Sequence, residues 1–118
     1  MTVQGVFANS TERRQVAAGE VLFAEGDSGQ QMFGVLSGSF ELRRGHTVVA
    51  SVGPGETFGE MSIIDDAVRT LTAVATEPSE VAAIDRRAFL FLVHETPTFA
   101  IQVMRSLAAR VRDHDNQI

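Results

Sequence analysis

One short stretch of the chain, residues 58–72, combines the residue types that bind a sugar phosphate. It holds Gly59, the carboxylate of Glu60, a short apolar run typical of a helix start, and Arg69. Glycine lets backbone N–H groups approach an anion closely, and the first turn of a helix has N–H groups without intrahelical acceptors. Arginine offers a planar fork to phosphate oxygens, while a carboxylate accepts hydrogen bonds from sugar hydroxyls. The stretch therefore predicts a site for a small ligand that is both sugar and phosphate.

Length and composition limit the classes of protein to which the chain can belong. Its 118 residues suit one domain with a real core, and 44% hydrophobic with 21% charged residues is ordinary globular usage. The net charge is −5 and every basic residue is arginine, so nucleic acid is not expected as a partner, because it favours a basic face. The absence of cysteine excludes disulfides and thiol chemistry.

Targeting and membrane signals are not visible in the sequence. No run of about eighteen apolar residues is present, and residues 1–10 lack the charged start and hydrophobic centre of a signal peptide. We therefore expect no membrane partner and a cytoplasmic location.

Short strands separated by turns are expected over the first three quarters of the chain. The segment 31–36 is apolar on both pleat faces, as in a strand between two layers, whereas 39–43 alternates, so that Phe40 and Leu42 face the core. Strands at this spacing predict a jelly-roll barrel or sandwich. The predicted strands cover residues 20–24, 31–36, 39–43, 47–52, 70–76 and 81–84.

The hydrophobic period then changes to that of helices. Asp85 is a good N-cap for a helix over residues 86–95, and Thr96 followed by Pro97 begins a second helix. The resulting plan is a single domain over 1–118, with an N-terminal segment (1–15), a β-roll (16–84) and C-terminal helices (85–118). Two apolar sets are expected on the helices: a core face of Phe89, Leu92 and Val93, and a stripe of Ala100, Met104, Leu107, Ala108 and Val111 on the final helix.

Two roles stay open for the stripe on the final helix, namely packing within the domain and a seam between two copies of the chain. The phenylalanines are most simply assigned to the core, at positions 23, 33, 40, 89 and 91.

Three passages, in order and at matching spacing, resemble the cyclic nucleotide-binding domain. They are AGEVLFAEGD (18–27), MFGVLSGSFEL (32–42), and FGEM through RTLT (58–72). The domain is shared by bacterial catabolite-activator-type regulators, regulatory subunits of cyclic-nucleotide-dependent kinases and cyclic-nucleotide-gated channels. The resemblance covers about residues 16–112. It implies a mainly β fold with C-terminal helices, a jelly roll of the cyclic nucleotide-binding type.

By this resemblance, residues 58–72 are the phosphate-binding cassette of the family. Glu60 is then expected to accept the ribose 2′-hydroxyl, and Arg69 to pair with the cyclic phosphate. Gly59, Met61 and Ser62 are expected to offer backbone N–H groups, with the Ser62 hydroxyl as an extra donor. The implied cassette residues are Phe58, Gly59, Glu60, Met61, Ser62, Arg69, Thr70, Leu71 and Thr72, with Thr70 near the phosphate and the last two along a pocket-side strand.

The nucleotide base is expected against apolar walls formed by Val49 and Leu71, with the final helix as a cover. Arg105, Ala109 and Arg112 are candidates for the covering position, and the sequence does not choose among them. Both cyclic AMP and cyclic GMP remain open as the ligand.

Three positions depart from the usual pattern of the family. Leu71 stands where alanine is usual and narrows the pocket, Val68 stands where proline is frequent, and Ser62 replaces an alanine. The hydroxyl of Thr72 is of interest because in some members a hydroxyl at this place favours guanine.

Other readings of Glu60 and Arg69 need no ligand. Glu60 can be a solvated turn acid, and Arg69 a surface arginine paired with Asp65 or Asp66. The two can also form a structural ion pair in a domain that has lost its ligand.

No catalytic or metal-binding pattern is evident. The histidines fall on a turn, a helix end and a polar tail, at His46, His94 and His114, without the spacing of metal ligands. No serine, histidine and acid arrangement suggests nucleophilic catalysis. We expect neither an enzyme nor a metal or other cofactor.

Three functions follow from these features. The first is a stand-alone sensor domain that binds cyclic AMP or cyclic GMP and signals through movement of the final helix. The second is a nucleotide-independent protein-interaction module that keeps the fold, for which Leu71 and Val68 are the motive. The third is the effector domain of a transcription regulator without its DNA-binding part, since the chain ends at Ile118. The expected partners are the nucleotide and either a second copy or another protein on the final helix.

Overall fold

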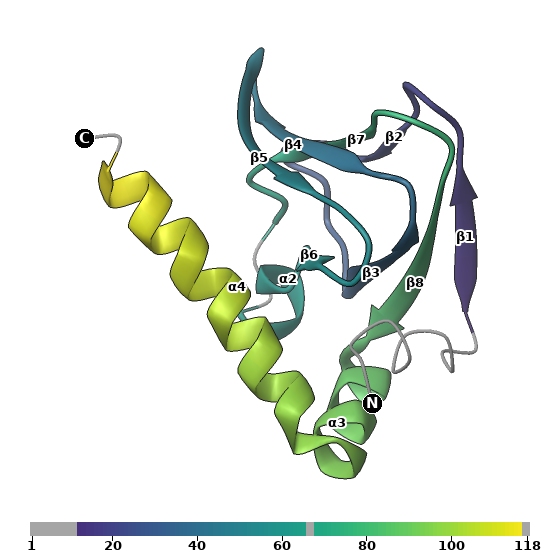
Figure 1. Ribbon diagram of the computed structural model, residues 1–118, viewed down its shortest axis with the longest axis vertical. Helices are drawn as coiled ribbons and strands as arrows, with labels where there is room; N and C mark the ends of the chain where they lie inside the picture. Colours follow the sequence, from purple (N-terminus) through teal and green to yellow (C-terminus); the bar gives the residue numbers. More distant parts are fainter. Residues whose placement is uncertain (1–11, 66–67, 117–118) are drawn as a thin grey trace.

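A computed structural model describes residues 12–65 and 68–116, except for the side chains of residue 110 and residues 112–116. The described residues form two antiparallel sheets followed by two longer helices (Figure 1). The first sheet has the order β1 (Arg13–Val16), β8 (Ser79–Asp85), β3 (Gln31–Ser37), β6 (Thr57–Phe58). The second has the order β2 (Val21–Phe23), β7 (Thr72–Ala75), β4 (Phe40–Arg44), β5 (Thr47–Val52). The helices are α2 (Met61–Ile64), α3 (Arg86–Glu95) and α4 (Pro97–Asn116).

The two sheets enclose an apolar core, as the predicted jelly roll requires. Phe40 and Leu42 on β4 are 0% and 2% exposed, so the predicted inward face of this strand is confirmed. The Phe58 ring lies 5.1 to 5.9 Å, between ring centroids, from the rings of three other phenylalanines. These are the contact distances of offset or tilted aromatic pairs, which stabilise a core beyond simple burial. The rings that meet Phe58 are those of Phe23, Phe33 and Phe40.

Strand β3 is buried on both of its faces, which confirms the prediction for residues 31–36. Phe33 and Val35 point into the core between the sheets, whereas Met32 packs with the helices. Its partner β8 divides its residues in the same way, with Ile84 on the helical side. The first sheet is therefore the middle layer between the second sheet and the helices.

The C-terminal helices begin where the sequence predicts. The Asp85 side chain caps α3 by accepting a hydrogen bond from the backbone N–H of Ala88 at 2.8 Å, and α4 begins at Pro97. The chain passes from α3 to α4 at Thr96, and α4 then runs diagonally past α2 and away from the roll (Figure 1). In the middle of α4, the Ser106 hydroxyl donates a hydrogen bond to the Thr57 carbonyl of the β-roll, at 3.4 Å. None of the described helices is long and apolar enough to cross a membrane.

The apolar stripe predicted on the final helix is only partly right. The residues of α4 that pack in the core are Phe99 and Val103, with Leu107 partly buried beside them. Met104 and Val111 belong to the predicted stripe, yet they are 59% and 60% exposed. The buried face of α4 contains every fourth residue from 99 to 107. The predicted stripe lies mostly on a neighbouring side of the helix, and most of that side is exposed to solvent.

Two further differences concern local elements. Phe91 was predicted to lie in the core but is 63% exposed, because α3 packs through Phe89, Leu92 and Val93, the face that the sequence predicts. Strands β1 and β6 were not predicted. Each is short, and β1 is exposed at all but its last residue, so neither shows a clear alternation of apolar residues.

Candidate functional site

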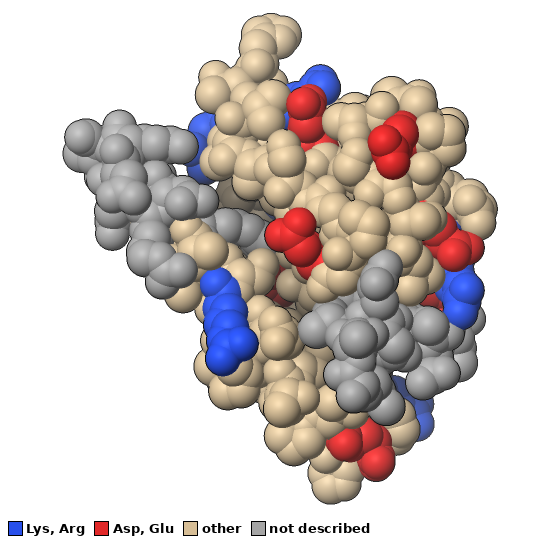
Figure 2. Space-filling view, viewed as in Figure 1, with Lys and Arg blue, Asp and Glu red and all other residues tan. Residues whose placement is uncertain are grey.

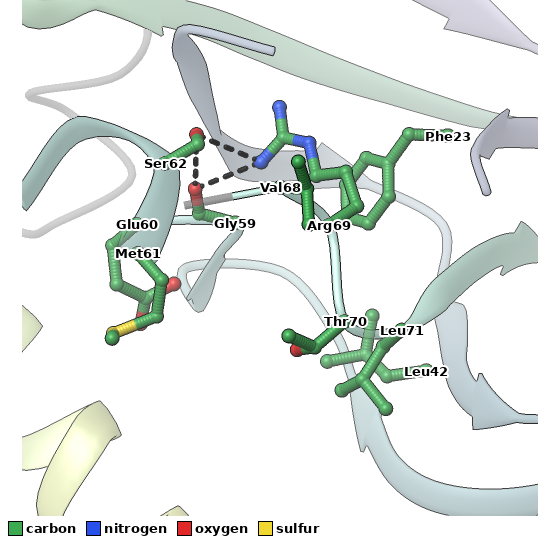
Figure 3. A pocket seen from close by; sticks show the side chains of 10 residues that line it. All are labelled: Phe23, Leu42, Gly59, Glu60, Met61, Ser62, Val68, Arg69, Thr70 and Leu71. Carbon is green, nitrogen blue, oxygen red and sulfur yellow. Dashed lines mark hydrogen bonds between the residues drawn. The ribbon is translucent and has the colours of Figure 1, made fainter. Parts of the chain in front are cut away.

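A cavity of about 420 Å³, part of it open to solvent, lies between the start of α2 and the segment that leads into β7. Figure 3 shows its lining side chains, with Ser62 and Arg69 on one side and Leu42 and Leu71 on another. The structure thus brings together most of the predicted cassette and adds three residues that were not predicted to be site residues. The predicted lining residues are Gly59, Glu60, Met61, Ser62, Arg69, Thr70 and Leu71; the added ones are Phe23, Leu42 and Val68.

Arg69 is the charged group at the centre of this arrangement. Although it is an arginine, it is only 7% exposed. Its Nη1 donates to the Gly59 carbonyl at 3.0 Å and to Ser62 Oγ at 2.9 Å. Its Nη2 donates to the Gln31 carbonyl at 2.6 Å, whereas its buried Nε has no hydrogen-bond partner among the described residues. Buried polar atoms are nearly always paired, so the Arg69 Nε is an exception that leaves one donor of the guanidinium unused.

Two glycines and one aromatic ring make room for the guanidinium. A Cβ on Gly29 would lie 2.7 Å from Nη2 of Arg69, and one on Gly59 would lie 2.9 Å from Nη1. Both distances are too short, so any larger residue at either position would displace the guanidinium. The ring of Phe23 lies on its remaining side, with the Arg69 Cζ 4.2 Å from the ring centroid, the geometry of a cation–π contact.

The backbone of Arg69 is fixed to the loop between β2 and β3. Its N–H donates to the Asp27 carbonyl at 2.8 Å, and its own carbonyl accepts from the N–H of Gly26 at 2.7 Å. These bonds pair the start of the segment into β7 with the loop, so the arginine is positioned through its backbone as well as its side chain.

Burial lowers the pKa of the Arg69 guanidinium from its ordinary value, because desolvation penalises the charged form. The negative charges of Asp27 and Glu60 act in the opposite direction and raise it. An anion bound at the cavity would add to this second effect. The electrostatics of the site therefore favour a negatively charged ligand.

Glu60 is completely buried and lines the cavity beside the cation. The interpretation of Glu60 as a solvated turn acid is therefore wrong, and so is that of Arg69 as a surface arginine. Arg69 directs its hydrogen bonds to two carbonyls and a hydroxyl rather than to Glu60, which acts on it only through its charge. The two residues are not joined by a direct hydrogen bond.

The apolar part of the lining includes the residue that departs most from the family pattern. Leu71 is partly buried, packs against the core and faces the cavity together with Leu42 (Figure 3). Its side chain therefore narrows the cavity from the side of the second sheet, while the exposed Met61 lies at its rim.

The other predicted site residues lie elsewhere. Phe58 is in the core, Val49 is half-buried on β5, and the Thr72 hydroxyl accepts a hydrogen bond from the N–H of Glu25 at 3.1 Å. None of these three lines the cavity, so their contact with a ligand stays a prediction. Two covering candidates, Arg105 and Ala109, line a separate hollow of about 570 Å³ between α4 and the turn before β6, and the side chain of the third, Arg112, lies outside the described residues.

Sequence reasoning also missed three residues that surround the Arg69 guanidinium. Gln31 acts through its backbone carbonyl, which no side-chain pattern reveals. Phe23 was assigned to the core alone, although its ring also covers the cation. Gly29 lies in a polar loop, and its only signal was its residue type.

Comparison with known proteins agrees with this geometry. Residues 13–96 match the family model of the cyclic nucleotide-binding domain. The chain belongs to this family. The family is a regulatory, nucleotide-binding one rather than a catalytic one, and a jelly roll with C-terminal helices is its fold.

The relatives include a cyclic AMP receptor protein and a catabolite activator protein. The chain is 38% identical over 112 residues to the cyclic AMP receptor protein of Thermus thermophilus, a match that covers 91% of this chain and 52% of the relative. The crystal structure of the catabolite activator protein from that organism superposes with a TM-score of 0.83 at 36% identity, covering 98% of this chain and 56% of the other.

A third match is nearer to this chain in length. It is a solved chain from work on a cyclic-GMP-dependent signalling pathway in bacterial phytopathogenesis, with a TM-score of 0.77 and 32% identity, covering 92% of this chain and 90% of the other. The present chain spans only about half the length of the curated receptor protein that it matches, 52%.

The close approach at Gly29 gives a testable prediction. Gly29→Ala should weaken binding of cyclic AMP and cyclic GMP by about tenfold or more, because the new Cβ displaces the guanidinium and loses a charge-assisted hydrogen bond. Isothermal titration calorimetry measures the change. Gly53→Ala is the matched control, since a Cβ there meets only a carboxylate oxygen at 3.8 Å. Equal affinities for the two variants would contradict the assignment of Gly29 to the site.

Proposed function

We propose that this chain is a sensor domain that binds cyclic AMP or cyclic GMP through residues 58–72 and signals through its C-terminal helices. The observation that carries the proposal is the buried Arg69, held by three acceptors in the wall of a cavity that the Glu60 carboxylate also lines. A cyclic phosphodiester supplies acceptor oxygens and the negative charge that the desolvated guanidinium favours.

The rest of the cavity suits the other parts of such a ligand. The Glu60 carboxylate lies in the lining, where it can accept a hydrogen bond from the ribose 2′-hydroxyl. The side chains of Leu42 and Leu71 offer an apolar surface near it, as small-molecule sites generally do.

The comparisons leave both nucleotides open. The Thermus relative carries cyclic AMP in its name, whereas the solved chain of similar length comes from a cyclic-GMP-dependent pathway. We therefore propose the cyclic nucleotide as the ligand class, and the affinity ratio for the two nucleotides identifies the natural signal.

The decisive test is a calorimetric titration with each nucleotide. We expect saturable binding that Arg69→Ala weakens by about ten- to a hundredfold, the effect of losing hydrogen bonds to a charged group. Arg69→Lys should restore little of it, because an ammonium lacks the fork geometry. If the wild-type protein gives no binding heat with either nucleotide at millimolar concentration, the proposal is rejected. That result would favour a nucleotide-independent interaction module.

A direct contact supports signalling to the helices. The Arg86 side chain, at the start of α3, donates from Nη2 to the Ile63 carbonyl of α2 at 2.6 Å. A shift of α2 on nucleotide binding would therefore pull on α3, and with it on α4, which packs against α3 through Phe89 and Phe99.

Removing this contact should uncouple the helices from the site. We expect Arg86→Ala to bind nucleotide within about threefold of wild type, since Arg86 does not line the cavity and distant changes add independently. The nucleotide-dependent change in amide hydrogen exchange of α4 should be lost. Arg87→Ala is the matched control, because Arg87 is an exposed neighbour on the same turn. An Arg86→Ala protein whose α4 still responds to nucleotide would show that the signal takes another route.

The exposed apolar side of α4 favours a second copy as the partner. Ile101, Met104 and Val111 are 45%, 59% and 60% exposed, and they recur at three- and seven-residue spacing, as in helices that pair along an apolar seam. We propose that the sensor dimerises through this side of α4.

Introduction of a charge tests the dimer. Met104→Glu should shift sedimentation from dimer to monomer at micromolar concentrations, because a carboxylate is costly to bury in an apolar seam. Gln102→Glu, on another side of the same helix, should leave the dimer intact. A wild-type protein that sediments as a monomer at all concentrations would refute the pairing.

A second candidate function is the effector part of a longer transcription regulator. It is supported by the share of the Thermus receptor protein that the chain spans, 52%. On the face shown in Figure 2, the described arginines are separated from one another by acidic and neutral side chains, so this face does not offer a broad basic surface for nucleic acid.

A further inference from the structure

Ser62 makes more hydrogen bonds inside the site than a passive lining residue needs. It lies on α2, is 2% exposed, and its Oγ accepts from Nη1 of Arg69 at 2.9 Å. The same hydroxyl lies 3.1 Å from the Gln31 carbonyl and 3.0 Å from the Gly59 carbonyl, to one of which it donates its single hydrogen. The hydroxyl is thus fixed from both sides, and Figure 3 shows it directed at the guanidinium.

The two residues come from opposite ends of the cassette. Ser62 precedes residues 65–68 and Arg69 follows them, so their hydrogen bond joins the two ends of this segment within a buried environment. A hydrogen bond that is buried and charge-assisted is stronger and more directional than an exposed neutral one. It can therefore fix a side chain that otherwise has many rotamers.

The contact with Ser62 determines how many N–H groups of the Arg69 guanidinium remain without an acceptor. A guanidinium has five N–H groups, and Nη1 uses both of its own on Gly59 and Ser62. Nη2 uses one on Gln31, so one N–H remains on Nη2 and one on Nε. Loss of the Ser62 acceptor would free one N–H of Nη1 and let the fork rotate.

We propose that Ser62 is a positioning residue, which fixes the orientation of Arg69 before the nucleotide arrives and so decides which exocyclic phosphate oxygen the arginine reads. The inference rests on the proposed function, because it concerns the same site. Its physical basis is preorganisation: a fixed donor loses less freedom on binding and discriminates between acceptors at different positions. The hydroxyl acts through Arg69: its single hydrogen goes to a backbone carbonyl, so in this structure it is not the extra donor to the ligand that the resemblance implied.

Phosphorothioate analogues of the nucleotide distinguish a positioning role from a merely structural one. A loss of stability alone would not change the ratio of the affinities for two such analogues. The Sp and Rp forms of cyclic AMP phosphorothioate carry sulfur in place of one or the other exocyclic oxygen, and sulfur is the weaker hydrogen-bond acceptor. A fixed guanidinium should distinguish them, so wild-type protein is expected to show clearly different affinities for the two forms. In Ser62→Ala, binding of cyclic AMP should weaken by about tenfold and the Sp to Rp affinity ratio should move toward one by at least about threefold.

Two further variants separate positioning from stability. Ser79→Ala removes another buried serine, 3% exposed, whose hydroxyl also hydrogen-bonds backbone carbonyls but lies at the start of β8. It should lose a similar amount of thermal stability and keep the wild-type ratio. Ser62→Thr keeps the hydroxyl, so it should retain the ratio even where its extra methyl lowers the melting temperature.

Each outcome decides between the two proposals. A wild-type protein that binds both analogues equally, or a Ser62→Ala protein that keeps the wild-type ratio, overturns the positioning role and leaves the proposed function standing. A Ser62→Thr protein that folds but behaves as Ser62→Ala also counts against the hydroxyl. A wild-type protein that binds no cyclic nucleotide overturns the proposed function and this role with it.

Discussion

The burial of one arginine governs the architecture around the cavity. A guanidinium removed from water is tolerated only where acceptors and opposite charges replace its hydration. Arg69 obtains acceptors from Gly59, Ser62 and Gln31, and favourable charge from acidic neighbours. Gly59 and Ser62 lie at the start of α2, whereas Gln31 is the first residue of β3. The site therefore exists only when β3, α2 and the segment into β7 are in place, and this dependence couples the fold to the ligand.

The β-roll supplies that placement through its central strand. β3 is buried between the second sheet and the helices, so its first residue, Gln31, is held in a rigid position from which its carbonyl receives Arg69. Phe23 and Phe33 extend the core up to the cation, which lies 4.2 and 5.7 Å from their ring centroids. The hydrophobic core and the charged site thus share the same aromatic residues. A substitution in this part of the core is expected to affect ligand affinity as well as stability.

The same strand leads to the helices that would carry a signal. Gln31 pairs in register with Asp85, whose side chain caps α3, and the next residue, Arg86, binds the carbonyl end of α2. The cavity and the C-terminal helices are therefore connected by two short paths, one through the sheet and one through a side chain. A ligand that shifts α2 would directly change the contact between Arg86 and α2. A ligand can shift the balance between two states only if it favours the contacts of one of them. The exposed apolar side of α4 lies at the end of this connection.

The sequence by itself determined the mainly β roll and the helix starts at Asp85 and Pro97, because these depend on local periodicity, capping and residue type. Its resemblance to the family implied that Glu60 and Arg69 belong to one cassette. The tertiary structure alone decided which acceptors receive the cation. Gln31 lies 38 positions from Arg69 and contributes a carbonyl that every residue possesses, so no pattern could single it out. It also decided which side of α4 is buried, since an amphipathic helix with apolar residues on two neighbouring sides can pack by either. Contacts between distant segments depend on how whole layers pack, and that information is not contained in any local stretch of sequence.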